Sequence, residues 1–259
     1  MCHLAAMKTL SLYTFLIILS IASYGQQQWQ IKVDGGYSVP VSKYGKVDVS
    51  QTISMVDGYP LAEYFDKEGH SAAETGSYYT VTIKRRFPNN KLIASAGFGQ
   101  GSNPVNTSEI SKYYTDFLND IFYYVFEQDD YEVTYGYLSV GYNHNISKLS
   151  FTVEPLIGYS SMCYPDYKMT VYLDATDEFR FDVIPTGPTE DIGALMIGIQ
   201  SAIDLTLLNR VLIGITMRYL SANYNYTIEP KAAGIDSRKR DDTVNYRVFN
   251  VGVSLGILF

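Results

Sequence analysis

Cysteine, tryptophan and long apolar runs are all scarce in this sequence. Its 259 residues include 2 cysteines and one tryptophan. One apolar run, from Leu10 to Ala22, stands out, and it is shorter than the roughly 20 residues that a transmembrane helix needs. Cys163 is the only cysteine beyond this run, so the remainder of the chain forms no intramolecular disulfide. We therefore exclude a membrane protein built from helices and a small exported domain held together by disulfides.

The start of the chain has the features of a secretory signal peptide. Lys8 precedes the apolar run, and Ser23, Tyr24 and Gly25 give a small-x-small sequence before residue 26. We predict a signal peptide over residues 1–25 and a single mature domain over residues 26–259. Met7 is an alternative start, because Lys8 would then lie in a short charged segment at the N-terminus. We expect no lipid anchor, since no lipid-attachment sequence precedes the cleavage point.

Positive charge is under-represented, whereas tyrosine is abundant. The chain has 27 Asp and Glu against 20 Lys and Arg, and it has 24 tyrosines. A protein that binds duplex nucleic acid carries the opposite sign of charge, so we exclude nucleic acid as a partner. Tyrosine suits both sheet surfaces and the membrane interface, where one end of a side chain is apolar and the other is wet. The composition favours a β-barrel in a membrane over an exported soluble protein.

Apolar and polar residues alternate with a period of two in about eight segments, which is the pattern of β-strands with one covered face. The segments are residues 29–39, 79–87, 92–98, 131–142, 149–159, 195–203, 211–219 and 248–259. In the fourth segment, Tyr131 and Tyr135 favour one face, whereas Leu138 and Tyr142 favour the other. We therefore expect a β-bulge near Gly136.

The connections between these segments alternate in length. We expect short turns at residues 88–90, 144–146 and 208–209, and long connections at residues 41–74, 101–129 and 161–191 and in a last charged loop around Lys231, Asp236 and Arg240. A transmembrane barrel with both chain ends in the periplasm has tight turns inside and long loops outside. A soluble sandwich has no reason to sort its connections this way. The sequence predicts an all-β fold, an eight-stranded antiparallel up-and-down transmembrane β-barrel with long extracellular loops.

In this pattern the chain resembles the small eight-stranded outer-membrane barrels of diderm bacteria, of the OmpA transmembrane-domain, OmpX and OmpW type. The likeness extends over nearly all of the mature chain. Its most specific element is the C-terminal sequence, with Phe259, Ile257, Leu255 and Val253 on one face. The resemblance implies a location in the outer membrane, contact with outer-membrane lipid, and recognition of the C-terminal segment by the barrel-assembly machinery. It is a likeness of pattern, and no functional motif of the family is matched.

If lipid covers the apolar face, the polar face points into the barrel. Charges of both signs are then inside, namely Lys32, Asp34, Lys84, Arg86, Glu154, Asp204 and Arg218, with Gln200 beside them. An eight-stranded barrel is just wide enough to be filled by its own side chains, and buried charges have to be paired. We interpret these residues as an internal salt-bridge network. The alternative is a gated polar channel.

Catalytic, metal and cofactor sites find little support in the sequence. Acyl-transfer chemistry needs a His with a nearby Ser and carboxylate. His144 falls in an expected periplasmic turn, and His70, next to Ser71, lies in an acidic polar loop. No pair of His or Cys residues has the spacing of metal ligands, and the GFGQG sequence at residues 97–101 lacks the context of a phosphate-binding loop. We expect no enzyme activity, metal or cofactor.

Two of the long connections have patterns of their own. Apolar residues recur at helical spacing behind Ser108, which could cap a helix, and this pattern predicts an amphipathic helix. This helix either packs as a lid over the barrel mouth or docks a partner or the membrane interface through a face formed by Ile110, Tyr113, Tyr114, Phe117 and Ile121. In the third long connection, the alternation over residues 169–173 and 179–183 predicts a hairpin that extends the barrel outward.

Together these features predict a non-enzymatic outer-membrane barrel with a filled interior and a structural or binding role for its outer loops. Two alternatives stay open: a narrow channel or transporter for a small or hydrophobic molecule, and an accessory subunit of an envelope machine with a protein partner in the cell envelope. A continuous cavity past Lys84, Arg86 and Arg218 would favour the channel.

Overall fold

The computed structural model describes most of the chain beyond the predicted signal peptide. The described residues are 29–46, 53–56, 59–62, 71–87, 91–117, 122–163, 165, 167–173, 179–186, 191–231 and 240–259. The predicted signal peptide, His70 and the expected turn at residues 88–90 lie outside them. No helix of the described part is both long and apolar enough to span a membrane.

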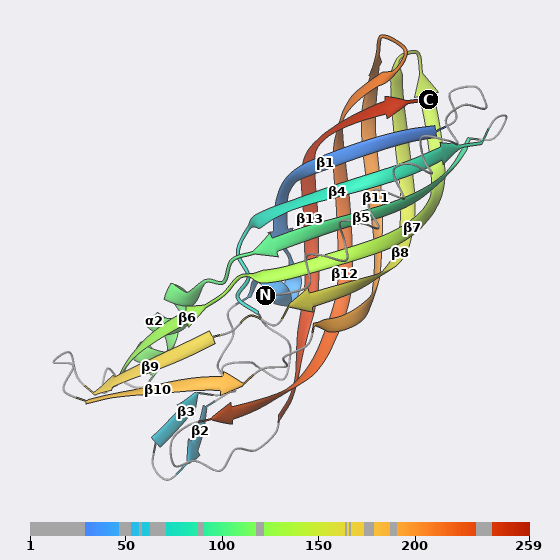
Figure 1. Ribbon diagram of the computed structural model, residues 1–259. Helices are drawn as coiled ribbons and strands as arrows, with labels where there is room; N and C mark the ends of the chain where they lie inside the picture. The colour runs from blue at the N-terminus through green and yellow to red at the C-terminus, as the bar shows by residue number, and fades with distance from the viewer. Residues whose placement is uncertain are drawn as a thin grey trace, which may run out of the picture.

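Eight antiparallel strands form a closed barrel, as the sequence predicts (Figure 1). The strands are β1 (Trp29–Pro40), β4 (Gly76–Arg86), β5 (Leu92–Asn103), β7 (Tyr131–Ile146), β8 (Leu149–Cys163), β11 (Ile192–Leu207), β12 (Val211–Lys231) and β13 (Arg240–Leu258). Each strand pairs with the next one along the chain, and β1 pairs with β13 from Gln30↔Leu258 to Pro40↔Val248. The topology is therefore up-and-down, and the barrel has no free edge.

Short connections lie at one end of the barrel and long ones at the other, which confirms the predicted alternation. The chain turns at residues 208–210, as expected, and at residues 147–148 instead of the expected 144–146, which still belong to a strand. Both turns lie at the same end as Trp29 and Phe259. Leu208 and Asn209 both have positive φ, 48° and 59°, and the Arg210 N–H donates to the Leu207 carbonyl at 3.0 Å. This is the turn whose twist matches a two-stranded hairpin. We call the end of the barrel with the short connections the short-turn end, and the opposite end, with the long connections, the long-loop end.

The long-loop end carries additional elements: η1 (Ser42–Gly45), β2 (Ile53–Val56), β3 (Tyr59–Ala62), α2 (Thr107–Phe117), β6 (Phe122–Gln128), β9 (Tyr167–Leu173) and β10 (Phe179–Thr186). The predicted hairpin is present as β9 and β10. Strand β6 joins the free side of β9, and β10 pairs with the far end of β12 from Ile184↔Lys231 to Thr186↔Glu229. Strands β6, β9 and β10 therefore continue the barrel sheet outward (Figure 1), and we call them the extension sheet.

The last long connection is shorter than expected, and its residues 232–239, with Asp236 among them, lie outside the described residues. Strands β12 and β13 remain paired as far as Ile228↔Arg240, well beyond the barrel body (Figure 1). The charged residues near Lys231 and Arg240 suggested a loop, but strand pairing in water tolerates charge on both faces. Inward tyrosines such as Tyr224 and Tyr246 continue the alternation and support the longer strands.

The two faces of the barrel wall separate as the alternation predicts. On the outer face, large apolar side chains are widely exposed: Val253 is 72% exposed, Leu195 66% and Leu138 65%. On the inner face of the same strands, Lys32, Glu154 and other polar residues are buried. Such a continuous apolar surface requires an apolar environment outside the barrel. The fold is that of a transmembrane β-barrel.

The expected β-bulge near Gly136 is wrong. The pairing of β5 with β7 runs without interruption from Leu92↔Tyr142 to Asn103↔Tyr131. Tyr131, Val133, Tyr135 and Tyr137 all point inward and are buried. The apparent change of register arises because the inner face is aromatic near the long-loop end and polar further down, so polarity alone misassigned the two faces.

Candidate functional site

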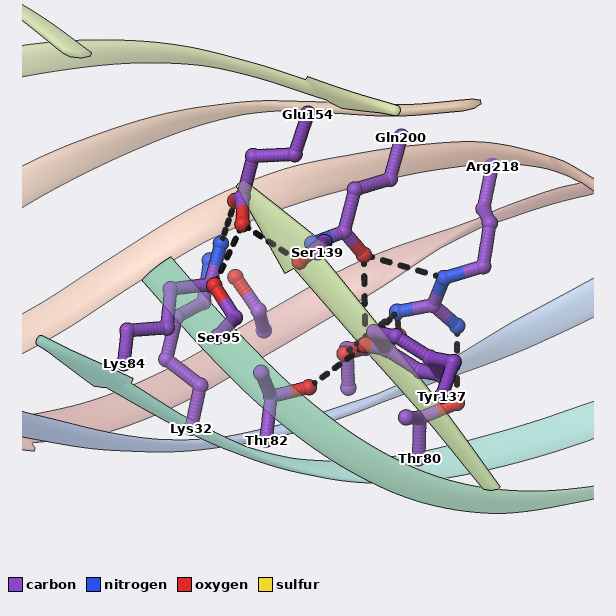
Figure 2. Close-up of polar contacts among 12 residues, drawn as sticks. Lys32, Thr80, Thr82, Lys84, Ser95, Tyr137, Ser139, Glu154, Gln200 and Arg218 are labelled. Carbon is purple, nitrogen blue, oxygen red and sulfur yellow. Dashed lines mark hydrogen bonds and ion pairs between the residues drawn. The ribbon is translucent and has the colours of Figure 1, made fainter. Parts of the chain in front are cut away.

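The barrel interior gathers polar side chains from strands that are far apart in the sequence. Because side chains alternate along a strand, every second residue points inward. The inward charged groups are Lys32 and Asp34 of β1, Lys84 of β4, Glu154 of β8, Asp204 of β11 and Arg218 of β12, and each of them is buried. Closure of the barrel brings these groups together, and Figure 2 shows most of the resulting contacts.

Arg218 is the centre of the largest group of contacts. Its side chain is 1% exposed, and its Nη2 lies 3.4 Å from both carboxylate oxygens of Asp34. Its Nη1 donates to Thr80 Oγ1 at 2.7 Å, and its Nε donates to Gln200 Oε1 at 3.1 Å (Figure 2). Its guanidinium also lies 5.3 Å from the ring centroid of Tyr137. Four different strands therefore hold this one cation.

A second ion pair joins β4 to β8. Lys84 pairs with Glu154 inside the barrel, and both side chains are buried. Ser95 and Ser139 also donate their hydroxyl hydrogens to Glu154 (Figure 2). The carboxylate thus receives three donors from three strands, which compensates for the loss of water.

The third pair lies nearer the short-turn end. Lys32 Nζ is 2.7 Å from Asp204 Oδ1, and both groups are almost completely buried. Ser254 contributes a long contact of 3.5 Å to the same oxygen. Arg86, the seventh residue of the predicted network, is half-buried and donates to Ser150 Oγ at 3.2 Å. The structure thus brings six of the seven residues into three ion pairs and holds Arg86 beside a serine.

Equal numbers of positive and negative charges make these contacts tolerable in a confined space. An unpaired buried charge is costly, whereas a pair with further hydrogen bonds recovers much of the lost solvation. Paired and shielded from solvent, these groups act as cross-links between strands. The described part of the chain also contains no group of three or more His, Cys, Asp or Glu residues that could hold a metal ion.

A second layer, of aromatic residues, fills the interior towards the long-loop end. Tyr44 of η1 is fully buried, and its ring centroid lies 5.5 Å from that of Tyr131 and 5.1 Å from that of Tyr246. Tyr224 packs against Tyr246 at 6.2 Å. Met162 and other buried apolar residues complete the cluster. We call this cluster the tyrosine plug.

Backbone hydrogen bonds hold η1 in the barrel mouth. The Val41 N–H donates to the Arg247 carbonyl at 2.9 Å, and the Ala73 N–H donates to the Tyr44 carbonyl at 3.0 Å. The Ala72 N–H donates to the Lys46 carbonyl at 3.0 Å. Burial, together with the neighbouring Tyr246 and Tyr131, raises the pKa of Tyr44 well above its ordinary value, so this side chain is neutral.

Sequence reasoning missed the tyrosine plug. It assigned only the polar face to the barrel interior, and the expected bulge near Gly136 put Tyr131 and Tyr135 on the apolar, lipid-facing side. The period-two alternation along each strand could have revealed the plug. Tyr131 and Tyr135 lie on the same face as Ser139, which is inward, and Tyr246 lies on the same face as Asn250. Counting by twos from a polar inward residue assigns these tyrosines to the interior.

The predicted helix is present as α2, but the structure says little of its proposed docking face. Ile110 is fully buried and therefore does not offer a surface to a partner. The side chains of Tyr113, Tyr114 and Phe117, and all of Ile121, lie outside the described residues. Ser108 was expected to cap the helix, and Asn106 has this contact instead, because its Oδ1 accepts the Glu109 N–H at 3.0 Å.

The other predicted residues lie on the outer wall. Ile257, Leu255 and Val253 are exposed on the lipid-facing side of β13, and Phe259 follows them with its N–H donating to the Trp29 carbonyl. Recognition of this segment by the barrel-assembly machinery stays a prediction. His144 lies near the end of β7, where its ring stacks on Tyr142 at 6.5 Å.

The closed wall, the apolar outer face and the sorted connections define this protein as an outer-membrane type β-barrel. No known protein family matches the sequence, and no curated protein is significantly similar to it. Several solved structures are similar to this one in fold.

Neisserial surface protein A is 8% identical, with a TM-score of 0.43 over 89% of this chain and 97% of its own. A major outer membrane protein from Thermus thermophilus is 9% identical, with a TM-score of 0.42 over 90% of this chain and 98% of its own. The Escherichia coli outer membrane protein W is 12% identical, with a TM-score of 0.32 over 91% and 100% of the two chains. These likenesses concern the fold alone.

Replacing Arg218 by Gln tests the largest group of contacts, because it leaves Asp34 without its cation. Removal of one partner of a buried pair costs about 3–5 kcal/mol. R218Q should lower the free energy of unfolding by about that amount in urea titrations of the protein in lipid vesicles. Lys112→Gln on the exposed side of α2 should change it by less than about 1 kcal/mol. The added substitution Asp34→Asn should recover part of the loss, and additive losses would contradict the pairing.

Two substitutions at Tyr44 separate packing from hydrogen bonding in the tyrosine plug. The Tyr44 hydroxyl has no hydrogen-bond partner among the described residues, so Tyr44→Phe should leave the plug intact. Tyr44→Ala removes a buried ring, at a local cost of about 3 kcal/mol. Amide exchange at Ala73, which bonds the Tyr44 carbonyl, should accelerate at least about tenfold in Y44A and remain unchanged in Y44F. Equal acceleration in both variants would contradict this packing.

Proposed function

We propose that this protein is a non-conducting, non-enzymatic barrel of the outer membrane whose work is done by the elements at its long-loop end. The apolar outer face supports residence in lipid, and the sorted connections support an orientation with the long-loop end outside the cell. In this proposal the barrel is an anchor, and the extension sheet and α2 form its binding platform. The partner is a component of the cell envelope or of its surroundings.

The filled interior is the observation that carries the proposal. A solute would have to pass the tyrosine plug and then the three ion pairs around Arg218, Glu154 and Asp204. The groups in both layers are buried and packed against one another. Among the described residues, these two layers support a filled interior over the continuous cavity on which the alternative of a channel depends.

The geometry of the extension sheet suits a binding platform. The sheet is anchored to β12, a strand of the barrel, and α2 packs against β6, where the Phe126 N–H donates to Ser111 Oγ at 2.9 Å. Tyr123 is 54% exposed beside Tyr172, with ring centroids 6.1 Å apart. Exposed tyrosines on a rigid element are frequent at protein interfaces, because they bury much surface at little cost in entropy.

A conductance measurement tests the filled interior. The folded protein, verified by its heat-modifiable mobility in gels, should give no openings in planar bilayers in which a general porin gives clear steps. Y44A should be silent as well, since the ion-paired layer below the tyrosine plug still fills the barrel. Discrete openings of the wild-type protein whose size changes in R218Q would contradict the proposal and favour the channel.

The orientation is tested by the thiol of Cys163. This exposed residue ends β8 at the long-loop end. A membrane-impermeant maleimide should label it on intact cells. In the background of Cys163→Ser, a cysteine in place of Ser147, at the short-turn end, should be labelled only after the outer membrane is permeabilised. Labelling of intact cells through position 147 but not through Cys163 would reverse the proposed orientation.

A further inference from the structure

Exposed charge is unevenly divided between the two ends of the barrel. At the short-turn end, the exposed charged side chains of the described residues are Arg85, Lys91, Lys148 and Arg210. The acidic residues of this region, Asp204 and Glu154, are buried in ion pairs. Exposed acidic residues, among them Glu127, Asp129, Asp130 and Glu132, lie at the long-loop end. A chain with an excess of negative charge thus presents a positive rim at its short-turn end.

Two of these cations lie against aromatic rings of the lipid-facing wall. Arg85 is the direct cross-strand partner of Trp29, and its guanidinium carbon lies 5.3 Å from that ring centroid and 5.5 Å from the ring centroid of Phe87. Lys91 Nζ lies 5.7 Å from the ring centroid of Tyr142. Aromatic rings at the edge of an apolar belt mark the level of the lipid headgroups. These cations therefore lie at headgroup depth, at the perimeter of the barrel.

The other two cations continue the rim around the barrel. Lys148 lies in the turn between β7 and β8, and Arg210 lies in the turn between β11 and β12. Each of the three short connections therefore carries at least one exposed cation. A guanidinium can bind a phosphate with two parallel hydrogen bonds, and an ammonium binds it as a point charge. A guanidinium or an ammonium keeps N–H donors available for a phosphate even when the side chain rests on an aromatic ring.

We propose that the positive rim formed by Arg85, Lys91, Lys148 and Arg210 binds the headgroups of anionic phospholipids in the membrane leaflet at the short-turn end. The placement over outward-facing rings favours lipid over any ligand that approaches along the barrel axis. The inference rests on the membrane-embedded barrel and is independent of the proposed binding platform. Bound lipid would fix the depth of the barrel and its tilt in the membrane.

Trp29 provides a direct test, because it is the only tryptophan of the sequence and lies under Arg85. The folded protein is placed in bilayers of phosphatidylglycerol and phosphatidylcholine, with bromine on the acyl chains of one lipid at a time. Quenching of Trp29 then reports which lipid lies beside it. At low ionic strength, phosphatidylglycerol should be preferred at Trp29 by about fivefold, the effect of one cation near a charged membrane surface. In about 0.5 M NaCl the preference should largely vanish, because salt screens exposed charges.

Charge variants separate the positive rim from other causes of lipid preference. The double substitution Arg85→Gln and Lys91→Gln should remove most of the preference, whereas Arg85→Lys alone should retain it. The matched control, Lys46→Gln with Lys112→Gln, removes two exposed cations at the long-loop end and should change nothing. Equal quenching by both lipids in the wild-type protein at low salt would overturn the proposal, and so would a preference that survives the double substitution. Heat-modifiable mobility in gels verifies that each variant is folded, so a loss of the barrel is distinguished from a loss of lipid binding.

Discussion

The pairing of β1 with β13 is the constraint from which the rest of the structure follows. Hydrocarbon offers no hydrogen bonds, so an unpaired strand edge in a membrane costs several kcal/mol for each exposed backbone group. Closure by the first and last strands leaves none of the eight barrel strands with an edge. It also assigns alternate side chains to two very different environments, lipid outside and a narrow enclosed space inside. Inward residues must then fill this space, and the charged ones among them need partners of opposite charge.

The interior meets this requirement with two layers of different chemistry. Near the middle and the short-turn end, three ion pairs with their hydroxyl and amide partners cross-link the strands. Towards the long-loop end, tyrosines from β7, β12 and β13 close around Tyr44, which η1 brings into the mouth. Both layers occupy the space that a channel would need. With the interior occupied, the proposed binding roles belong to the extension sheet at one end and to the positive rim at the other.

The period-two pattern predicts most of the wall, because lipid on one side and confinement on the other leave few exceptions to alternation. It predicts the strands, their inward charges and the hairpin of β9 and β10. It does not predict which charges meet, since Arg218 and Asp34 are 184 residues apart and become neighbours only through closure. It also fails where polarity and position disagree: inward Tyr131 and Tyr135 look like lipid-facing residues, and the charged ends of β12 and β13 look like a loop. At these positions, tertiary packing determines which way a side chain points and how far a strand extends.

The exchange of the Arg218 side-chain Nε–H with water tests the central claim, that the closed barrel encloses a buried layer of paired charges. Nitrogen-15 NMR of the folded protein in lipid nanodiscs detects the Nε–H of an arginine only if its exchange with water is slow. The structure, in which this group donates to Gln200 Oε1, predicts a resolved resonance at neutral pH that is absent in Arg218→Lys. Exchange as fast as that of the exposed Arg210 would mean that water fills the barrel and would contradict the account.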